Sequence, residues 1–362
     1  MLKNSSKETI EPKSEPSILI FSATTPLANG GVKKFSDEIL KGLQLTKHNA
    51  LALFGRKSNN LITSFFDLVK RYRTFLKEAK VVHFVSLSPY NIPFLIIAKL
   101  QKKRIIVTYH GIYSEELSVF KKPHMLLLYW IADMLSKQFA DVIVSPSAYL
   151  AKKLKLHDAI IIPNPIDIQS LDHLRKETTS ADEEIIIVTS SNFNIKKKAD
   201  GLYYLLRAMD NIGKDFGHVK LLVFGDGEEL QRFKSESSHR TNVMFMGFRD
   251  DFLSFLASAR AYIHVSGLDN QPYSLIEALI LGKVILCNNL DSLSEMIDKN
   301  SNYLVSLNSI SITEGIFSLI TDIINDSEMV NNKGKQNRRL AVETYSTEVI
   351  TRKYLGIYRD IT

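Results

Sequence analysis

Short apolar runs that alternate with amphipathic stretches are the feature that most restricts the fold of this 362-residue chain. The first run, Ser17 to Ser22, is apolar at four successive positions, as in a strand buried on both faces of a parallel sheet. Lys33 to Leu45 instead repeats its apolar residues at helical spacing. In this half we expect further strands at 50–54, 81–85, 104–109 and 141–145, and helices at 61–78, 93–100 and 122–139. The alternation predicts an α/β fold with a doubly wound parallel sheet.

The same alternation restarts in the second half of the chain. A strand at 160–167 ends in a Pro-Asn-Pro turn, and the polar segment 168–182 is typical of a linker. Strands are then expected at 184–189, 219–224, 242–246, 261–265 and 283–287, and helices at 201–209 and 250–259. The length is sufficient for two domains with separate cores. We therefore predict an N-terminal domain at 17–167, a C-terminal domain at 183–345, a cleft between them, and a disordered leader at 1–16.

The segment from Gly267 to Leu279 places two carboxylates near one expected crevice. Asp269 lies in a loop after a strand, and Glu277 follows eight residues later on a helix. Pro272 suits a helix start, so the amides of Tyr273, Ser274 and Leu275 would be free donors for an anion. The alternative is a capping box, in which Ser274 and Glu277 satisfy the start of their own helix and bind no ligand.

Two further segments follow strands of the first domain. Gly30-Gly31 ends the loop before the first helix, where a phosphate could approach the backbone closely, although a simple turn has the same sequence. His110-Gly111 comes directly after another expected strand. A histidine there could bind a sugar hydroxyl or a phosphate, or be purely structural.

Charge is distributed unevenly along the chain. Up to residue 180 there are 26 basic and 15 acidic residues, whereas the remainder has 20 and 24. In the first half the basic residues cluster with apolar ones along the expected helix 61–78, which favours contact with an anionic membrane surface; the alternative is an ordinary solvated helix face. No helix-turn-helix, zinc-finger or RNA-binding signature accompanies the charge, so we do not expect nucleic acid as a partner.

Composition also bears on the cellular setting. Cys287 is the only cysteine, which excludes a disulfide within the chain and a cysteine-based metal site, and fits a reducing cytosol. Residues 1–16 lack the apolar core of a signal peptide, and runs such as 92–100 are too short to span a bilayer. We expect a cytoplasmic protein that contacts a membrane, if at all, at its inner face.

Together these segments resemble the retaining glycosyltransferases of family 4, which have the GT-B fold of two Rossmann-like doubly wound domains facing across a cleft. The most specific element is Asp269-x7-Glu277 with the following Gly282, which is similar to the family's Glu-x7-Glu motif. Other matching elements occur in order: Gly30-Gly31, His110-Gly111, Ile162 to Asp167, Phe224 to Gly227 and Phe245 to Gly247. The resemblance extends over nearly the whole chain from Ser17.

The resemblance implies a role for each matching residue. Gly30 and Gly31 would approach the donor diphosphate, His110 and Asp269 would lie by the transferred sugar, and Glu277 would hold the ribose. The family's first glutamate is aspartate here, and its arginine after the first strand of the second domain is missing from 189–201. Lys197 or Lys198 would act as the family's lysine, with Asn192 or Asn194 near the arginine position. The remaining expected donor contacts are Gly225, Gly247, Phe248, Ser274 and Leu275.

The expected activity is transfer of a sugar from a nucleotide diphosphate sugar to an acceptor hydroxyl with retention of configuration. The family resemblance implies a same-face reaction, a final helix at 346–362 that crosses back onto the first domain, and closure of the cleft by hinge motion. We expect no cofactor or metal, and an acceptor that is a glycan or a lipid-linked molecule in bacterial-type surface glycan or glycolipid synthesis. The alternatives are a non-catalytic partner subunit of a glycosyltransferase and a GT-B epimerase or hydrolase of nucleotide sugars.

Overall fold

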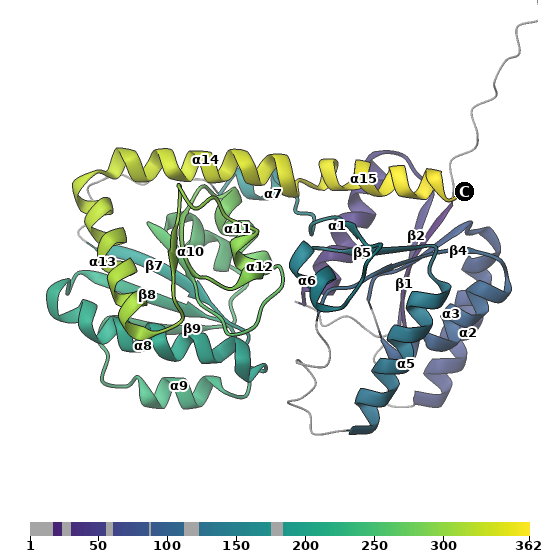
Figure 1. Ribbon diagram of the computed structural model, residues 1–362, viewed down its shortest axis with the longest axis horizontal. Helices are drawn as coiled ribbons and strands as arrows, with labels where there is room; N and C mark the ends of the chain where they lie inside the picture. The colour runs from purple at the N-terminus through teal and green to yellow at the C-terminus, as the bar shows by residue number, and fades with distance from the viewer. Residues whose placement is uncertain (1–16, 24–29, 56–60, 87, 112–122, 175–183) are drawn as a thin grey trace, which may run out of the picture.

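Two α/β domains lie side by side, and the C-terminal helices run along one side of both (Figure 1). The computed structural model describes residues 17–23, 30–55, 61–86, 88–111, 123–174 and 184–362. The expected leader 1–16 and most of the expected linker 168–182 lie outside these residues.

The first domain contains six parallel strands in the order β2-β1-β3-β4-β5-β6. Along β1, Leu19 and Phe21 enter the core on one face of the sheet, whereas Ile18 and Ile20 enter the core on the other. Both faces are therefore buried, which explains the unbroken apolar run in the sequence. The strands are β1 (Ile18–Ser22), β2 (Ala50–Phe54), β3 (Val81–Phe84), β4 (Arg104–Thr108), β5 (Val142–Ser145) and β6 (Ile160–Ile161), and the helices are α1 (Gly31–Leu45), α2 (Leu61–Glu78), η1 (Pro89–Asn91), α3 (Ile92–Leu100), α5 (Pro123–Phe139) and α6 (Ala148–Lys153).

The second domain repeats this architecture with the strand order β12-β11-β10-β7-β8-β9. Its strands are β7 (Ile185–Ser190), β8 (Val219–Phe224), β9 (Val243–Gly247), β10 (Ala261–His264), β11 (Val284–Asn288) and β12 (Tyr303–Val305). Its helices are α7 (Gln169–Asp172), α8 (Lys196–Asp215), α9 (Leu230–Glu236), α10 (Phe252–Ser258), α11 (Tyr273–Ile280), α12 (Asp291–Ser294), α13 (Ser309–Asn325) and α14 (Ser327–Tyr345). The two sheets confirm the predicted pair of doubly wound α/β domains.

The end of the chain joins the two domains. Ile166 forms a parallel bridge with Ser346, so the two segments that pass between the domains are paired. The last helix, α15 (Thr347–Asp360), then lies on the first domain, where the Tyr358 hydroxyl is 2.8 Å from Nδ1 of the buried His83. The last helix therefore returns to the domain that contains β1 (Figure 1).

Strand order determines where the loops of interest gather. In the first sheet β1 lies between β2 and β3, and in the second β7 lies between β10 and β8. From β1 and from β7 the chain therefore first adds strands on one side and then crosses over to add strands on the other side. Ligands of doubly wound folds bind at such switch points, beyond the carboxyl ends of the strands. Gly31, His110, Asn192 and Asp269 follow β1, β4, β7 and β10, and Gly225 and Phe248 follow β8 and β9.

Candidate active site

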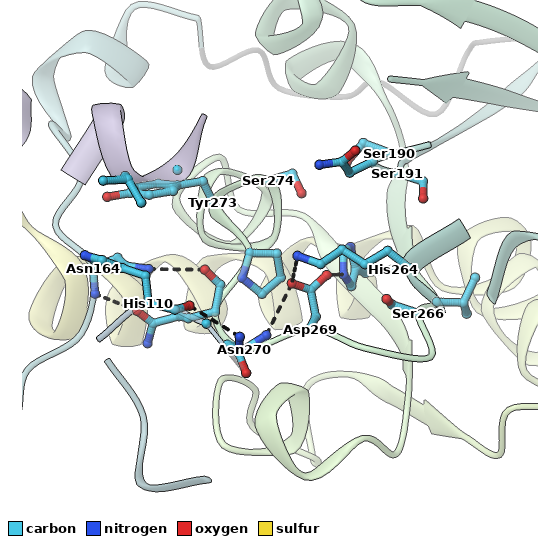
Figure 2. Close-up of a pocket in the computed structure, with 18 residues that line it drawn as sticks. His110, Asn164, Ser190, Ser191, His264, Ser266, Asp269, Asn270, Tyr273 and Ser274 are labelled. Atoms are coloured by element: carbon cyan, nitrogen blue, oxygen red, sulfur yellow. Dashed lines mark hydrogen bonds and ion pairs between the residues drawn. The ribbon is translucent and has the colours of Figure 1, made fainter. Parts of the chain in front are cut away.

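Two adjoining cavities occupy the cleft between the domains. The first, of about 440 Å³, is lined from the first domain by His110 and Asn164 and from the second by Lys198 and Asp269, among others. The second, of about 530 Å³, is lined by Gly30 and Glu277, among others. Gly31, Ser190 and Tyr273 line both cavities, so the two form one elongated site. Figure 2 shows the first cavity, with residues of both domains around it.

Asp269 lies in the first cavity as a buried, paired carboxylate. Lys198 Nζ is 3.3 Å from its Oδ1, and His264 Nε2 is 3.1 Å from its Oδ2. Burial alone would raise its pKa, but the charge of Lys198 and the contact with His264 outweigh burial and lower the pKa of Asp269 to about 2. Asp269 is therefore ionised near neutral pH and suited to accept hydrogen bonds rather than to donate a proton.

A hydrogen-bonded group behind Asp269 fixes its orientation. The Tyr262 hydroxyl lies 3.1 Å from His264 Nδ1 and 2.8 Å from both Ser190 Oγ and Ser274 Oγ. Sequence reasoning missed Tyr262 and His264. The sequence does contain a signal for them, since two residues with polar groups occupy alternate positions of a buried strand. Side chains at i and i+2 of a strand project to the same face, so the two can form one polar cluster.

His110 contributes a neutral imidazole to the first cavity. Its ring packs edge-on against Phe35 with the centroids 4.5 Å apart, and its Nε2 is buried without a hydrogen-bond partner among the described residues. Burial lowers the pKa of His110 to about 4, although a hydrogen bond with the Val85 backbone opposes the shift. The ring therefore suits hydrogen bonding more than charge pairing near neutral pH.

Further buried polar atoms without partners line the site in the described residues. They are Asn164 Oδ1, Ser191 Oγ and Asn270 Oδ1, from residues that line the first cavity, and the hydroxyl of Tyr273, a residue that lines both cavities. Buried polar atoms are normally hydrogen-bonded, so a concentration of exceptions indicates a place for a polar ligand. Hydroxyl groups of a sugar would satisfy them.

Gln271 connects the domains beside these atoms, and sequence reasoning missed it. Its Oε1 accepts a hydrogen bond from the backbone N–H of Asn164 at 2.5 Å, and its Nε2 donates one to the Pro146 carbonyl at 3.0 Å. Asn270 Nδ2 also donates to the His110 carbonyl at 3.3 Å. The loop after β10 therefore bonds directly to the first domain.

Glu277 is the buried carboxylate of the second cavity. It is 7% exposed, and its Oε1 pairs with Lys34 of α1 in the other domain. The N-cap of α11 is Pro272, without a side-chain capping bond. The capping-box interpretation of Glu277 is therefore wrong, and the carboxylate faces the cleft.

The start of α11 differs from the expectation at one residue. The backbone amide of Leu275 donates a hydrogen bond to the Pro272 carbonyl at 3.2 Å, and the Leu275 side chain is buried in the core of the second domain. Its amide is therefore not the free donor expected from the sequence. Ser274 lines the first cavity.

The structure brings most other predicted residues to the site but separates the two lysines. Lys198 lines the first cavity, whereas the Lys197 side chain is exposed and lines neither cavity. Asn192 lines the first cavity, while Gly225, Gly247 and Phe248 line the second. No group of three or more His, Cys, Asp or Glu side chains suited to a metal ion occurs in the described residues.

Comparison with known proteins assigns the family. Residues 30–170 match the model of glycosyltransferase family 4, and residues 171–339 match that of the group 1 glycosyl transferases. This chain belongs to the family 4 glycosyltransferases. This glycosyltransferase is 26% identical over 277 residues to an uncharacterised glycosyltransferase of Methanocaldococcus jannaschii, a match that covers 70% of this chain and 66% of the relative. It is 24% identical over 298 residues to the N-acetyl-alpha-D-glucosaminyl L-malate synthase of Bacillus anthracis, with 75% and 73% covered.

Solved structures agree with the fold of this glycosyltransferase. The Anabaena protein HepE in complex with UDP and glucose superposes with a TM-score of 0.71 at 15% identity, covering 95% of this chain and all of HepE. A glycosyltransferase from Rickettsia africae gives a TM-score of 0.74 at 17% identity, with 96% and 98% covered. Such neighbours establish the GT-B fold.

Proposed function

We propose that this glycosyltransferase moves a sugar from a nucleoside diphosphate sugar to an acceptor hydroxyl with retention of configuration. The observation that carries the proposal is the elongated cleft, in which the buried carboxylates Glu277 and Asp269 lie in adjoining cavities that meet at Gly31 and Tyr273. The two oxygens of Glu277 can accept hydrogen bonds from neighbouring ribose hydroxyls. The diphosphate would then lie at Gly31, and the sugar would enter the first cavity.

The first cavity favours a same-face reaction over a covalent intermediate. Asp269 is the only carboxylate among the described residues that line it, and pairing with Lys198 and His264 makes Asp269 a weak nucleophile. In the proposed step the C1–O bond to the diphosphate breaks and leaves its electron pair on phosphate. The acceptor oxygen bonds to the same face of C1 and gives its proton to the departing phosphate. The Gly31 region and the start of α11 would stabilise the leaving charge.

The proposal is tested by nucleotide binding followed by product analysis. The melting temperature of the full chain should rise when one of UDP, GDP or ADP, or the corresponding sugar donor, is added. A ligand at 100 times its Kd stabilises the native state by about 2.7 kcal/mol. With a glycan or glycolipid acceptor, the product should have the anomeric configuration of the donor. An inverted product would exclude the same-face step. Rapid donor hydrolysis or epimerisation without acceptor would favour the nucleotide-sugar hydrolase or epimerase, and absence of nucleotide binding would overturn the proposal.

We also propose that catalysis needs no metal or cofactor, because amides and lysines would stabilise the diphosphate. Dialysis against EDTA should leave the transfer rate within about twofold of its initial value. Addition of Mg²⁺ or Mn²⁺ to the dialysed protein is the matched measurement. A rate that collapses with EDTA and returns with either ion would contradict this expectation.

We propose that the acceptor is presented at the cytoplasmic face of an anionic membrane, in surface glycan or glycolipid synthesis. No helix of the described residues is long and apolar enough to cross a bilayer. The helices α2, α3 and α5 lie side by side in the first domain (Figure 1), and α5 exposes 58% of Leu127 and 61% of Trp130. The neighbouring helix α2 and the end of α3 carry basic residues: Lys70, Arg71, Arg73, Lys77, Lys99, Lys102 and Lys103. This combination suits an anionic lipid surface.

Vesicle flotation measures the membrane proposal. The double variant Leu127→Ser/Trp130→Ser should bind anionic vesicles at least roughly tenfold more weakly than the wild type, because it loses the apolar contacts of α5. The control is Ile310→Ser, which changes a side chain of the second domain that is 72% exposed. Equal flotation of wild type on neutral and anionic vesicles would remove the proposed electrostatic contribution.

A further inference from the structure

The segment after β7, where the resemblance places the cations for the diphosphate, offers little positive charge to the two cavities. The segment 189–201 after β7 has no arginine. Of its lysines, Lys196 and Lys197 are exposed and line neither cavity, while Lys198 is paired with Asp269. A departing diphosphate carries several negative charges, which a transferase must stabilise in the transition state.

Lys34 extends from the other domain into the same region. Its backbone amide donates to the Gly30 carbonyl at 3.1 Å, which places Lys34 on the first turn of α1, three residues after Gly31. Its Nζ lies 5.0 Å from the centre of the Tyr273 ring. A Cβ on Gly31 would be 3.6 Å from the same ring. The Lys34 ammonium and the Gly31 backbone therefore both lie beside Tyr273, where the two cavities meet.

Glu277 is the present partner of the Lys34 side chain. This ion pair crosses the cleft and leaves Lys34 32% exposed and Glu277 10% exposed at their side chains. A buried carboxylate needs a partner in the protein without ligand, and Lys34 provides it. The ribose proposed to bind Glu277 would bring hydroxyl donors to the same oxygens. Ribose and Lys34 consequently compete for one carboxylate.

We infer that Lys34 exchanges Glu277 for the donor diphosphate and stabilises the leaving group in place of the missing arginine. The inference rests on the proposed donor site. Lysine suits the exchange because its charge lies at the end of a flexible four-carbon chain. During transfer Lys34 keeps its proton and stabilises the electron pair left on phosphate by charge alone, while the acceptor proton goes to phosphate. Lys34 is thus assigned as a catalytic residue supplied by the first domain.

The test compares nucleoside and nucleoside diphosphate binding by calorimetry in the Lys34→Gln variant of the full chain. The probes are uridine with UDP, or the corresponding pair for whichever of UDP, GDP and ADP binds the wild type. Loss of Lys34 should weaken diphosphate binding at least roughly tenfold, since it removes a charge-assisted contact with the phosphate oxygens. Nucleoside binding should stay equal or become tighter, because its ribose no longer competes with an ammonium for Glu277. Lys34→Arg should restore part of the diphosphate affinity.

Lys41→Gln is the matched control. Lys41 also lies on α1 and pairs with a carboxylate, Asp167, but it lines neither cavity. Its loss should leave both affinities unchanged. If Lys41→Gln lost as much diphosphate affinity as Lys34→Gln, the effect would come from the net charge of the protein, and the role of Lys34 would be overturned. Tighter binding of both probes to Lys34→Gln would mean that Lys34 only blocks the site, and unchanged binding of both would also overturn the inference. If the wild type binds neither probe, the proposed function itself fails.

Discussion

The Lys198→Met variant should lose about 3 kcal/mol of unfolding free energy at pH 7 and most of its transfer activity, because it leaves the buried Asp269 carboxylate with His264 as its remaining side-chain partner. Methionine retains most of the length of the side chain and removes the ammonium group, with its charge and its hydrogen-bond donors. Denaturant unfolding of both proteins measures the loss. Lys197→Met is the control, since the neighbouring side chain is exposed and should change stability by at most about 0.5 kcal/mol.

The pH dependence distinguishes a lost ion pair from a packing defect. In the wild type the pKa of Asp269 is lowered to about 2, below its ordinary unfolded value of about 3.9. The stabilising contribution of the ionised carboxylate is therefore complete above about pH 4 and is lost as pH falls toward 2. In Lys198→Met the pKa of Asp269 should rise, so the stability difference between the two proteins should shrink from pH 4 toward pH 2. A difference that is constant across this range would indicate packing instead.

The Glu277→Gln variant should lower kcat/KM for the donor at least roughly 100-fold, since two charge-assisted hydrogen bonds to ribose are weakened. Glutamine has a similar size and keeps one acceptor oxygen, and Glu277 does not cap its helix, so the fold should persist. The matched control is Asp250→Asn, which removes one negative charge from an exposed residue of the same cavity. Wild-type kinetics in Glu277→Gln would remove its assigned role.

The fold could be predicted because each strand carries its own signal. Strands buried on both faces of a parallel sheet carry apolar side chains at successive positions, as in 18–21, and such runs are visible without tertiary information. Asp269, Glu277 and His110 could likewise be predicted, because each follows or lies near the carboxyl end of an expected strand.

The remaining parts of the site depend on contacts between distant segments. Lys34 and Glu277 are 243 positions apart, and nothing local indicates that they meet. The choice of Lys198 over Lys197 depends on the orientation of α8, since adjacent helical residues point in different directions. The amide of Leu275 is not free because the first turn of α11 uses it internally, and the side chain lies in the core. Local patterns thus locate the loops, whereas packing of the two domains decides which side chains enter the cleft.

The most direct measurement is a crystal structure of the full chain with an intact nucleoside diphosphate sugar. We expect the ribose at Glu277, the diphosphate beside Gly31 with Lys34 turned toward it, and the sugar in the first cavity between His110 and Asp269. A nucleotide bound outside the cleft, or one whose ribose makes no contact with Glu277, would contradict the proposed donor site.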